Sequence, residues 1–274
     1  MVWPQPSRPR SWVERGRHRS IDTSVPGLGH APGRIRTFDL ALRRRALYPL
    51  SYGRSTGQCT DSLVAAVALL LYDNPVSSNA LKVRFMLAEV GLGYERRTVP
   101  FDLPRPSWYL AVNPVGGIPA LDDGGIVLAE SHAILRYLAA RERRDDLYPA
   151  DLRARATVDE FLDRWALTFR PAFFRHESPA LGFVLGKGML GGDPRPDELP
   201  AAVAAITPTL RLLDEILDPS GFALGRFTVA DVAAAPILFR TTKTGLDLAP
   251  YTNISRWRET VLAWPSFAAA GPVS

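Results

Sequence analysis

The chain has 274 residues, and its 46% hydrophobic content is sufficient for the core of one large or two ordinary domains. Its apolar runs stay well below the ~18 residues of a membrane-spanning helix, which argues against a membrane span. The net charge is +5, but residues 1–62 hold eleven Arg, no Lys and four acids. The positive excess therefore lies in this segment and does not indicate that the rest of the chain binds nucleic acid.

Residues 1–62 are rich in Arg, Pro, Ser and Gly and lack a sustained apolar period, so we expect disorder there. An organellar targeting peptide or a nucleic-acid contact would also fit this composition. Residues 33–53, however, resemble peptides that arise when a reading frame runs through a transfer-RNA gene, and we interpret the segment as a spurious leader. The single cysteine, Cys59, lies in it, so the expected folded part has no thiol and no intrachain disulfide.

Regular structure is expected from residue 69 onward. Residues 69–72 predict a short buried strand, residues 80–91 a helix preceded by capping residues, and residues 94–99 a second strand. Two further short strands are predicted at 118–121 and 126–128, followed by a helix at 131–141. This order is that of a βαβ-ββα unit.

Only helical patterns follow, at about 151–176, 198–217, 228–240 and 253–263. The predicted fold class is therefore α/β plus all-α, with a thioredoxin-like domain over 67–145 and an all-helical domain over 152–270. Thr228 and Asp231 have the spacing of a capping box, for which replacement of Asp231 by Ala is expected to cost about 1 kcal/mol.

Several ordered motifs resemble the glutathione S-transferase family, over roughly 200 of the 274 residues. They are the loop at 71–79, Asn-Pro-x-Gly-x-Ile-Pro at 113–119, Glu-Ser at 130–131, the segment 224–231 and the last helices near 254–267. The resemblance is to a serine-type member, theta- or delta-like or a bacterial relative. It implies a glutathione-binding N-terminal domain and an all-helical C-terminal domain.

The resemblance assigns glutathione binding to Gly117, Ile118, Pro119, Glu130 and Ser131. A cis Ile118–Pro119 bond would turn backbone groups outward to pair with the tripeptide, whereas an ordinary trans bond would only start a strand. Ser131 and Glu130 would hold the γ-glutamyl end near a helix N-terminus, or serve only as a cap and a surface acid. Gly117 stands where many relatives have Lys or Arg for the glycyl carboxylate.

The resemblance also implies that Ser77 activates the thiol, with Asn79 and then Ser78 as the next candidates. Lowering the pKa of a thiol by about two units requires about 2.7 kcal/mol, close to one charge-directed hydrogen bond. The alternative is that all three residues only cap the helix. Tyr72 is interpreted as core-facing, and the absence of cysteine from this loop disfavours thioltransferase chemistry.

Three aromatic residues of the first long helix, Trp165, Phe169 and Phe173, share one face and are candidates to line a second-substrate cleft, or else are core. Arg164, Arg170 and His176 are interpreted as solvated, without a role. The histidines lack metal-ligand spacing, so no metal is expected.

The predicted function is a glutathione transferase that activates the glutathione thiol for attack on a small electrophile. A cytoplasmic homodimer is expected, with glutathione as cosubstrate. The alternatives are a non-catalytic ligand-binding or interaction protein of the same fold, or a thiol-dependent isomerase or dehalogenase. Of these, the non-catalytic alternative draws support from Gly117 and from the ambiguous Ser77–Asn79 loop.

Overall fold

The computed structural model describes residues 69–183 and 192–272; predictions for the leader, for Cys59 and for the start of the first domain at residues 67–68 lie outside the described residues. A four-stranded sheet is built from β1 (Leu69–Asp73), β2 (Tyr94–Thr98), β3 (Ala120–Asp123) and β4 (Ile126–Ala129). Its order is β2-β1-β3-β4, with β1 and β2 parallel and the other pairs antiparallel.

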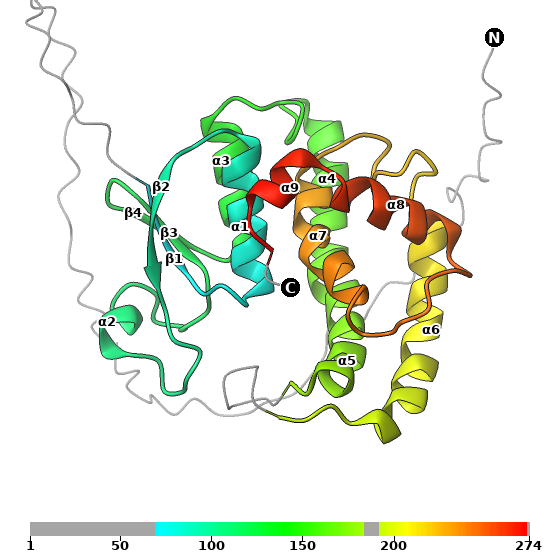
Figure 1. Ribbon diagram of the computed structural model, residues 1–274. Helices are drawn as coiled ribbons and strands as arrows, with labels where there is room; N and C mark the ends of the chain where they lie inside the picture. The colour runs from blue at the N-terminus through cyan, green and yellow to red at the C-terminus, as the bar shows by residue number, and fades with distance from the viewer. Residues whose placement is uncertain (1–68, 184–191, 273–274) are drawn as a thin grey trace, which may run out of the picture. The chain divides into compact units, whose positions relative to one another are not determined.

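Three helices accompany this sheet, α1 (Ser78–Glu89), α2 (Ser107–Leu110) and α3 (Ser131–Arg141). Helices α1 and α3 lie on one face of the sheet and α2 on the other (Figure 1). Helix α1 begins two residues earlier than predicted, because Ser77 is its N-cap. Strand β3 begins at Ala120 rather than Ile118, since Pro119 has no N–H to give to a ladder.

The remaining described chain is helical. Its elements are α4 (Leu152–Arg164), the π-helical turn η1 (Trp165–Phe169), α5 (Arg170–Leu181), η2 (Pro196–Glu198), α6 (Leu199–Ile216), α7 (Val229–Thr241), α8 (Thr252–Leu262) and α9 (Pro265–Ala269). The predicted fold class, α/β followed by all-α, is confirmed. None of the described helices combines the length and apolar character needed to cross a membrane.

One hydrophobic core runs from the sheet into the helical part. It includes Leu71 of β1, Phe85 of α1, Leu135 of α3 and Trp257 of α8, all fully buried. The sequence pattern places a domain boundary near residues 143–152, between α3 and α4. Because the two parts share a core, that boundary stays a prediction.

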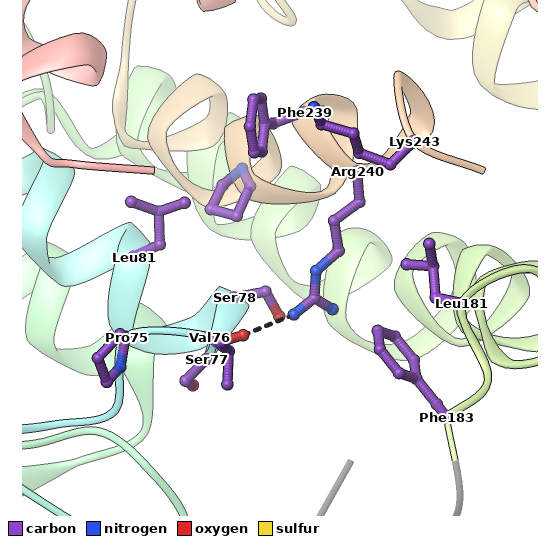
Figure 2. A pocket seen from close by; sticks show the side chains of 11 residues that line it. Pro75, Val76, Ser77, Ser78, Leu81, Leu181, Phe183, Phe239, Arg240 and Lys243 are labelled. Carbon is purple, nitrogen blue, oxygen red and sulfur yellow. Dashed lines mark hydrogen bonds between the residues drawn. The ribbon is translucent and has the colours of Figure 1, made fainter. Parts of the chain in front are cut away.

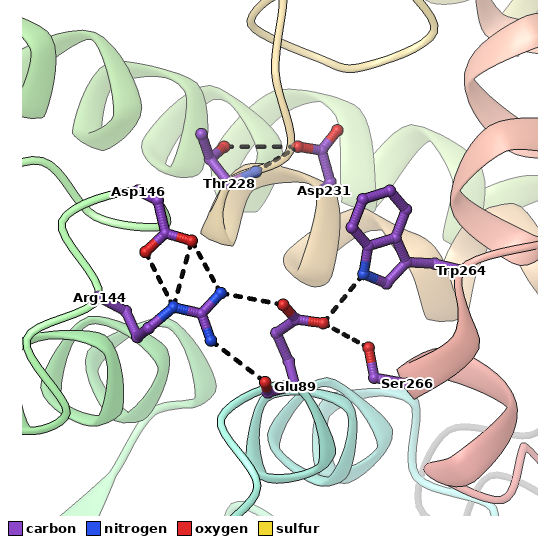
Figure 3. A network of polar contacts seen from close by, with 7 residues as sticks. All are labelled: Glu89, Arg144, Asp146, Thr228, Asp231, Trp264 and Ser266. Carbon is purple, nitrogen blue, oxygen red and sulfur yellow. Dashed lines mark hydrogen bonds and ion pairs between the residues drawn. The ribbon is translucent and has the colours of Figure 1, made fainter.

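Glu89, at the end of α1, ties the sheet part to the C-terminal helices (Figure 3). Its carboxylate accepts hydrogen bonds from Trp264 Nε1 at 2.9 Å, from the Ser266 hydroxyl and from Arg144 Nη2 at 3.1 Å. Arg144 also donates to the Glu89 backbone oxygen at 3.2 Å and pairs with Asp146. Hydrogen bonds to a charged group are stronger than neutral ones, so this cluster fixes how α9 meets α1.

Replacing Glu89 with Gln is expected to lower the free energy of unfolding by about 1 to 2 kcal/mol, because all three donors lose a charged acceptor and the amide NH2 group cannot accept in place of one carboxylate oxygen. Urea unfolding followed by tryptophan fluorescence measures this loss. Glu160→Gln is the matched control, since its ion pair with Arg164 is exposed on both sides and should contribute little. Equal losses in the two variants would contradict the role of the cluster.

Candidate functional site

The loop after β1 is held by buried polar contacts. Asp73 and Arg84 are 1% and 2% exposed, and Arg84 Nη1 lies 3.0 Å from Asp73 Oδ2. Arg84 Nη2 also donates to the Pro75 carbonyl at 3.2 Å, and Asn74 Nδ2 donates to the Val99 carbonyl at 2.9 Å. Buried charges need such pairing to persist, so the loop enters α1 in one fixed conformation.

Ser77 is the N-cap of α1, and its hydroxyl accepts a hydrogen bond from Ala80 N at 3.2 Å. The hydroxyl also donates a hydrogen bond to the Ile118 carbonyl, at the long distance of 3.5 Å. A serine hydroxyl has two acceptor sites and one donor proton, and capping uses only an acceptor. Capping therefore does not use the proton, and because its 3.5 Å bond to Ile118 is at the weak limit of hydrogen bonding, a bound anion can take its place. Ser78 is buried and Asn79 is exposed.

The segment before β3 contains the predicted cis bond, between Ile118 and Pro119. The Gly117 carbonyl accepts hydrogen bonds from the Tyr109 hydroxyl and from Asn113 Nδ2, the latter at 2.7 Å. These contacts fix the backbone beside Ser77. The exposed Gly117 offers only backbone to a ligand.

Glu130 and Ser131 lie at the same end of the β3-β4 hairpin as Pro119, because Ala120 pairs with Ala129. Glu130 has φ 65° and ψ 110°, a conformation that costs a non-glycine residue about 1–3 kcal/mol. Its side chain does not cap α3, and the Ser131 hydroxyl makes no hydrogen bond within the described part of the chain. Ser131 is thus 8% exposed at the start of α3, and its Oγ has no partner in the described residues.

A buried lysine lies next to this turn. Lys82 of α1 is 3% exposed, and its Nζ is 3.1 Å from His132 Nε2. Burial, followed by the positive charge of Arg170, lowers the pKa of Lys82 to about 7, while Glu130 opposes the shift. Burial and the charge of Lys82 lower the pKa of His132 to about 3, so the imidazole is neutral. The pair was not identified from the sequence.

Two cavities open beside Ser77 and Ser78. The first, of about 320 Å³, lies between the loop and helices α5 and α7, and is lined by Leu81, Leu181, Phe183, Phe239, Arg240 and Lys243 among others (Figure 2). The second, of about 350 Å³, is lined by Asn79, Phe101, Arg170, Pro171 and Phe174 in addition to the two serines. Ser77 and Ser78 thus lie between the two cavities, so a group bound in one cavity can meet a group bound in the other.

The three aromatic residues expected to line a second-substrate cleft, or else to be core, belong to the core. Trp165, Phe169 and Phe173 are at most 1% exposed, and they line neither cavity beside Ser77. Trp165 instead packs edge-on against Trp257 of α8 with ring centroids 5.7 Å apart. Helical spacing groups side chains on one face, but it does not say whether that face meets a cleft or another helix.

Arg164, Arg170 and His176 were all expected to be solvated, but they differ in exposure. Arg164 is exposed and pairs with Glu160. Arg170 is only 16% exposed in its side chain, and His176 is 2% exposed. Burial lowers the pKa of both Arg170 and His176. Arg170 therefore belongs to the surroundings of the site, which its sequence position did not indicate.

Arg240 and Glu177 complete the site and were missed in the sequence. Arg240 Nη2 donates to the Val76 carbonyl at 2.8 Å (Figure 2). Arg240 Nη1 lies 3.3 Å from Glu177 Oε2. The arginine therefore links helix α7 to the loop that presents Ser77. Within the described residues, no cluster of three or more His, Cys, Asp or Glu has the arrangement of a metal site.

Comparison with known proteins agrees with this geometry. Residues 76–141 match the model of the glutathione S-transferase N-terminal domain, and residues 196–260 that of the C-terminal domain. Glutathione S-transferase 3 of Zea mays is 33% identical over 210 residues, which cover 73% of this chain and 91% of that protein.

Solved structures show the same similarity. Human glutathione S-transferase T1-1 in its apo form has a TM-score of 0.63 and 30% identity, covering 74% of this chain and 87% of that one. A theta-class enzyme from Xanthomonas axonopodis pv. citri with glutathione bound has a TM-score of 0.64 and 25% identity, covering 76% and 98%. With both domain models matched in order and a full-length relative at this identity, the chain belongs to the glutathione S-transferase family.

Proposed function

We propose that the protein is a glutathione transferase in which Ser77 stabilises the glutathione thiolate for attack on a small electrophile. The observation that carries the proposal is the position of the Ser77 hydroxyl, which lies at the boundary of two cavities and whose proton is held only by a long, 3.5 Å hydrogen bond to the Ile118 carbonyl. The Ile118 backbone lies beside it, where an extended tripeptide could pair with it.

The role of each residue follows from its place. The Ile118 backbone would pair with the cysteinyl part of glutathione, and Ser131 with the free N–H groups at the start of α3 would bind the γ-glutamyl carboxylate. Glu130, exposed next to Ser131, would accept from the γ-glutamyl ammonium. Gly117 would offer only backbone. Asn79 and Ser78 are the reserve candidates for contact with the sulfur, and Asn79 lines the second cavity together with Ser77.

The chemistry is nucleophilic substitution or conjugate addition. The thiol proton passes to solvent, the thiolate sulfur bonds to the electrophilic carbon, and a leaving group departs with its electron pair or the carbanion is protonated. The Ser77 hydroxyl donates to the sulfur, favouring the thiolate over the thiol, and the cavities position both reactants. Family membership also supports a homodimer that acts in the cytoplasm, and sedimentation of the purified protein would test its size.

Replacing Ser77 with Ala is expected to raise the pKa of bound glutathione by about one to two units, because one hydrogen bond to a charged group is worth about 1.5–3 kcal/mol. Titration of thiolate absorbance in the presence of saturating protein measures this pKa. In the unchanged protein it should lie about two units below the 8.5 of a free thiol.

Ser78→Ala is the matched control, because Ser78 is equally buried, at 6% exposure, one residue further on. It should leave the thiol pKa within a few tenths of a unit. A bound thiol with an unshifted pKa in the unchanged protein would contradict the proposal and favour a non-catalytic binding protein. A larger effect for Ser78→Ala would move the role to Ser78.

A further inference from the structure

The charges around the two cavities are of one sign. Arg240 and Lys243 line the first cavity, Arg170 lines the second, and neither has an Asp or Glu among its described lining residues. Residues 1–62 carry more positive charge than the +5 of the whole chain, so the remainder has a slight negative excess. The positive lining is therefore a local feature of the site.

These cations are incompletely neutralised. Arg170 and Arg240 share a single oxygen of Glu177, at 3.2 and 3.3 Å, and Glu177 is 1% exposed. Arg170 Nη1 is buried without a hydrogen-bond partner in the described part of the chain. Lys243 forms no ion pair with any described residue. One carboxylate is thus shared by two arginines, and Lys243 adds a third cation that has no carboxylate partner among the described residues, so these four side chains carry an excess of about two positive charges.

The walls of the first cavity are apolar and partly aromatic. Leu81, Leu181, Phe183 and Phe239 form them, while the Arg240 guanidinium lies beside Val76 and the Lys243 ammonium lies against Phe239 (Figure 2). The Lys243 Nζ lies 5.6 Å from the Phe239 ring centre, and Lys243 is exposed. An occupant that satisfies both parts of this surface needs an apolar or aromatic body and an anionic group.

We propose that the second substrate is an amphipathic anion, an aromatic or alkyl electrophile that carries a carboxylate or a similar group recognised by Lys243. This inference rests on the proposed function, since Ser77 must direct the thiolate into the same cavity. The reactive carbon lies toward Ser77, and the carboxylate lies toward the C-terminal end of α7. The positive lining also steers such anions into the site.

A matched pair of electrophiles tests the charge alone. With 4-chloro-3,5-dinitrobenzoate, the glutathione sulfur bonds to the chlorine-bearing carbon, chloride leaves with the bonding electrons, and the thiol proton goes to solvent. The neutral 4-chloro-3,5-dinitrobenzamide reacts in the same way and has nearly the same size. The kcat/KM of the full chain with each compound is divided by the rate of its uncatalysed reaction with glutathione.

The expected result is that the benzoate is preferred over the benzamide and that Lys243→Met lowers its normalised kcat/KM about fivefold, the effect of one partly exposed charge pair. Lys243→Glu should lower it about 25-fold, since attraction becomes repulsion. The benzamide should change less than twofold in both variants. Arg226→Met is the control, because it removes an exposed cation outside both cavities.

Three outcomes would overturn the inference. Equal normalised rates for the two compounds would show that charge is not recognised, while the Ser77 mechanism stands if the bound-thiol pKa is still lowered. A rise in the KM for glutathione in Lys243→Met, with no change in electrophile preference, would assign the lysine to glutathione instead. Absence of conjugation with both compounds, together with an unshifted thiol pKa, would reject the proposed function and this inference with it.

Discussion

Replacing Asp231 with Ala is expected to lower the free energy of unfolding by about 4 kcal/mol, far more than the loss of an ordinary helix cap. The carboxylate of Asp231 is fully buried and accepts hydrogen bonds from Thr228 N and Ala223 N, each at 2.8 Å, and from Trp257 Nε1 at 2.7 Å. Each buried donor left without a partner costs about 1–3 kcal/mol. Urea unfolding monitored by circular dichroism measures the loss.

Asp151→Ala is the matched control for this prediction. Asp151 caps α4 through Arg153 N and Ala154 N, but it is exposed, so water can replace its carboxylate. Its loss should cost about 1 kcal/mol. If the two variants were equally destabilised, the contacts of Asp231 with Ala223 and Trp257 would contribute nothing beyond the cap.

The same aspartate has a predictable pH signature. Burial, against the opposing hydrogen bonds, raises the pKa of Asp231 to about 6, above its usual 3.8. A raised acid pKa means that the folded state holds the proton more tightly, so this group stabilises the protein at low pH and that contribution is lost as the pH rises through about 6. The destabilisation by Asp231→Ala should therefore be about 1 kcal/mol larger at pH 5 than at pH 7.

The capping box illustrates what sequence can and cannot predict. The spacing of Thr228 and Asp231 identified the local hydrogen bonds of the cap, and both are present. The bond from Trp257 reaches across 26 residues of chain, and no local pattern signals it. Counting the cap alone gives about 1 kcal/mol for Asp231→Ala, and the contacts with Ala223 and Trp257 raise the expected cost to about 4 kcal/mol.

In the candidate site, too, the sequence located the contiguous motifs but not the long-range contacts. Contiguous motifs located Ser77, Ile118–Pro119 and Glu130–Ser131, and the hairpin register brings the last two segments together. Arg240, whose bond to Val76 spans 164 residues, has no such motif. The aromatic stripe was ambiguous because a core face and a cleft face have the same helical period, and the packing against Trp257 decides between them.

A second large effect, on the pH dependence of stability, is expected from the buried Lys82. Its folded-state pKa of about 7 is far below the 10.5 of an exposed lysine, since burial disfavours the ammonium and Arg170 repels it. Between these two values the unfolded chain binds a proton that the folded chain does not. The stability of the unchanged protein should therefore rise with pH in this window, by about 2 kcal/mol from pH 7 to pH 9.

Replacing Lys82 with Met should remove this rise, because methionine has a similar length and no proton to lose. The variant should be more stable than the unchanged protein at pH 7, and the two should converge toward pH 9. His132, with a folded-state pKa of about 3, is neutral throughout this range and does not obscure the comparison.

Lys243→Met is the matched control for the pH experiment, since it makes the same substitution at an exposed position. Urea unfolding at pH 7, 8 and 9 compares the three proteins. An identical slope in the unchanged protein and in Lys82→Met would mean that Lys82 is charged when folded, paired with Glu130. In that case replacement should destabilise the protein slightly at every pH, because the exposed carboxylate of Glu130 would lose its cation.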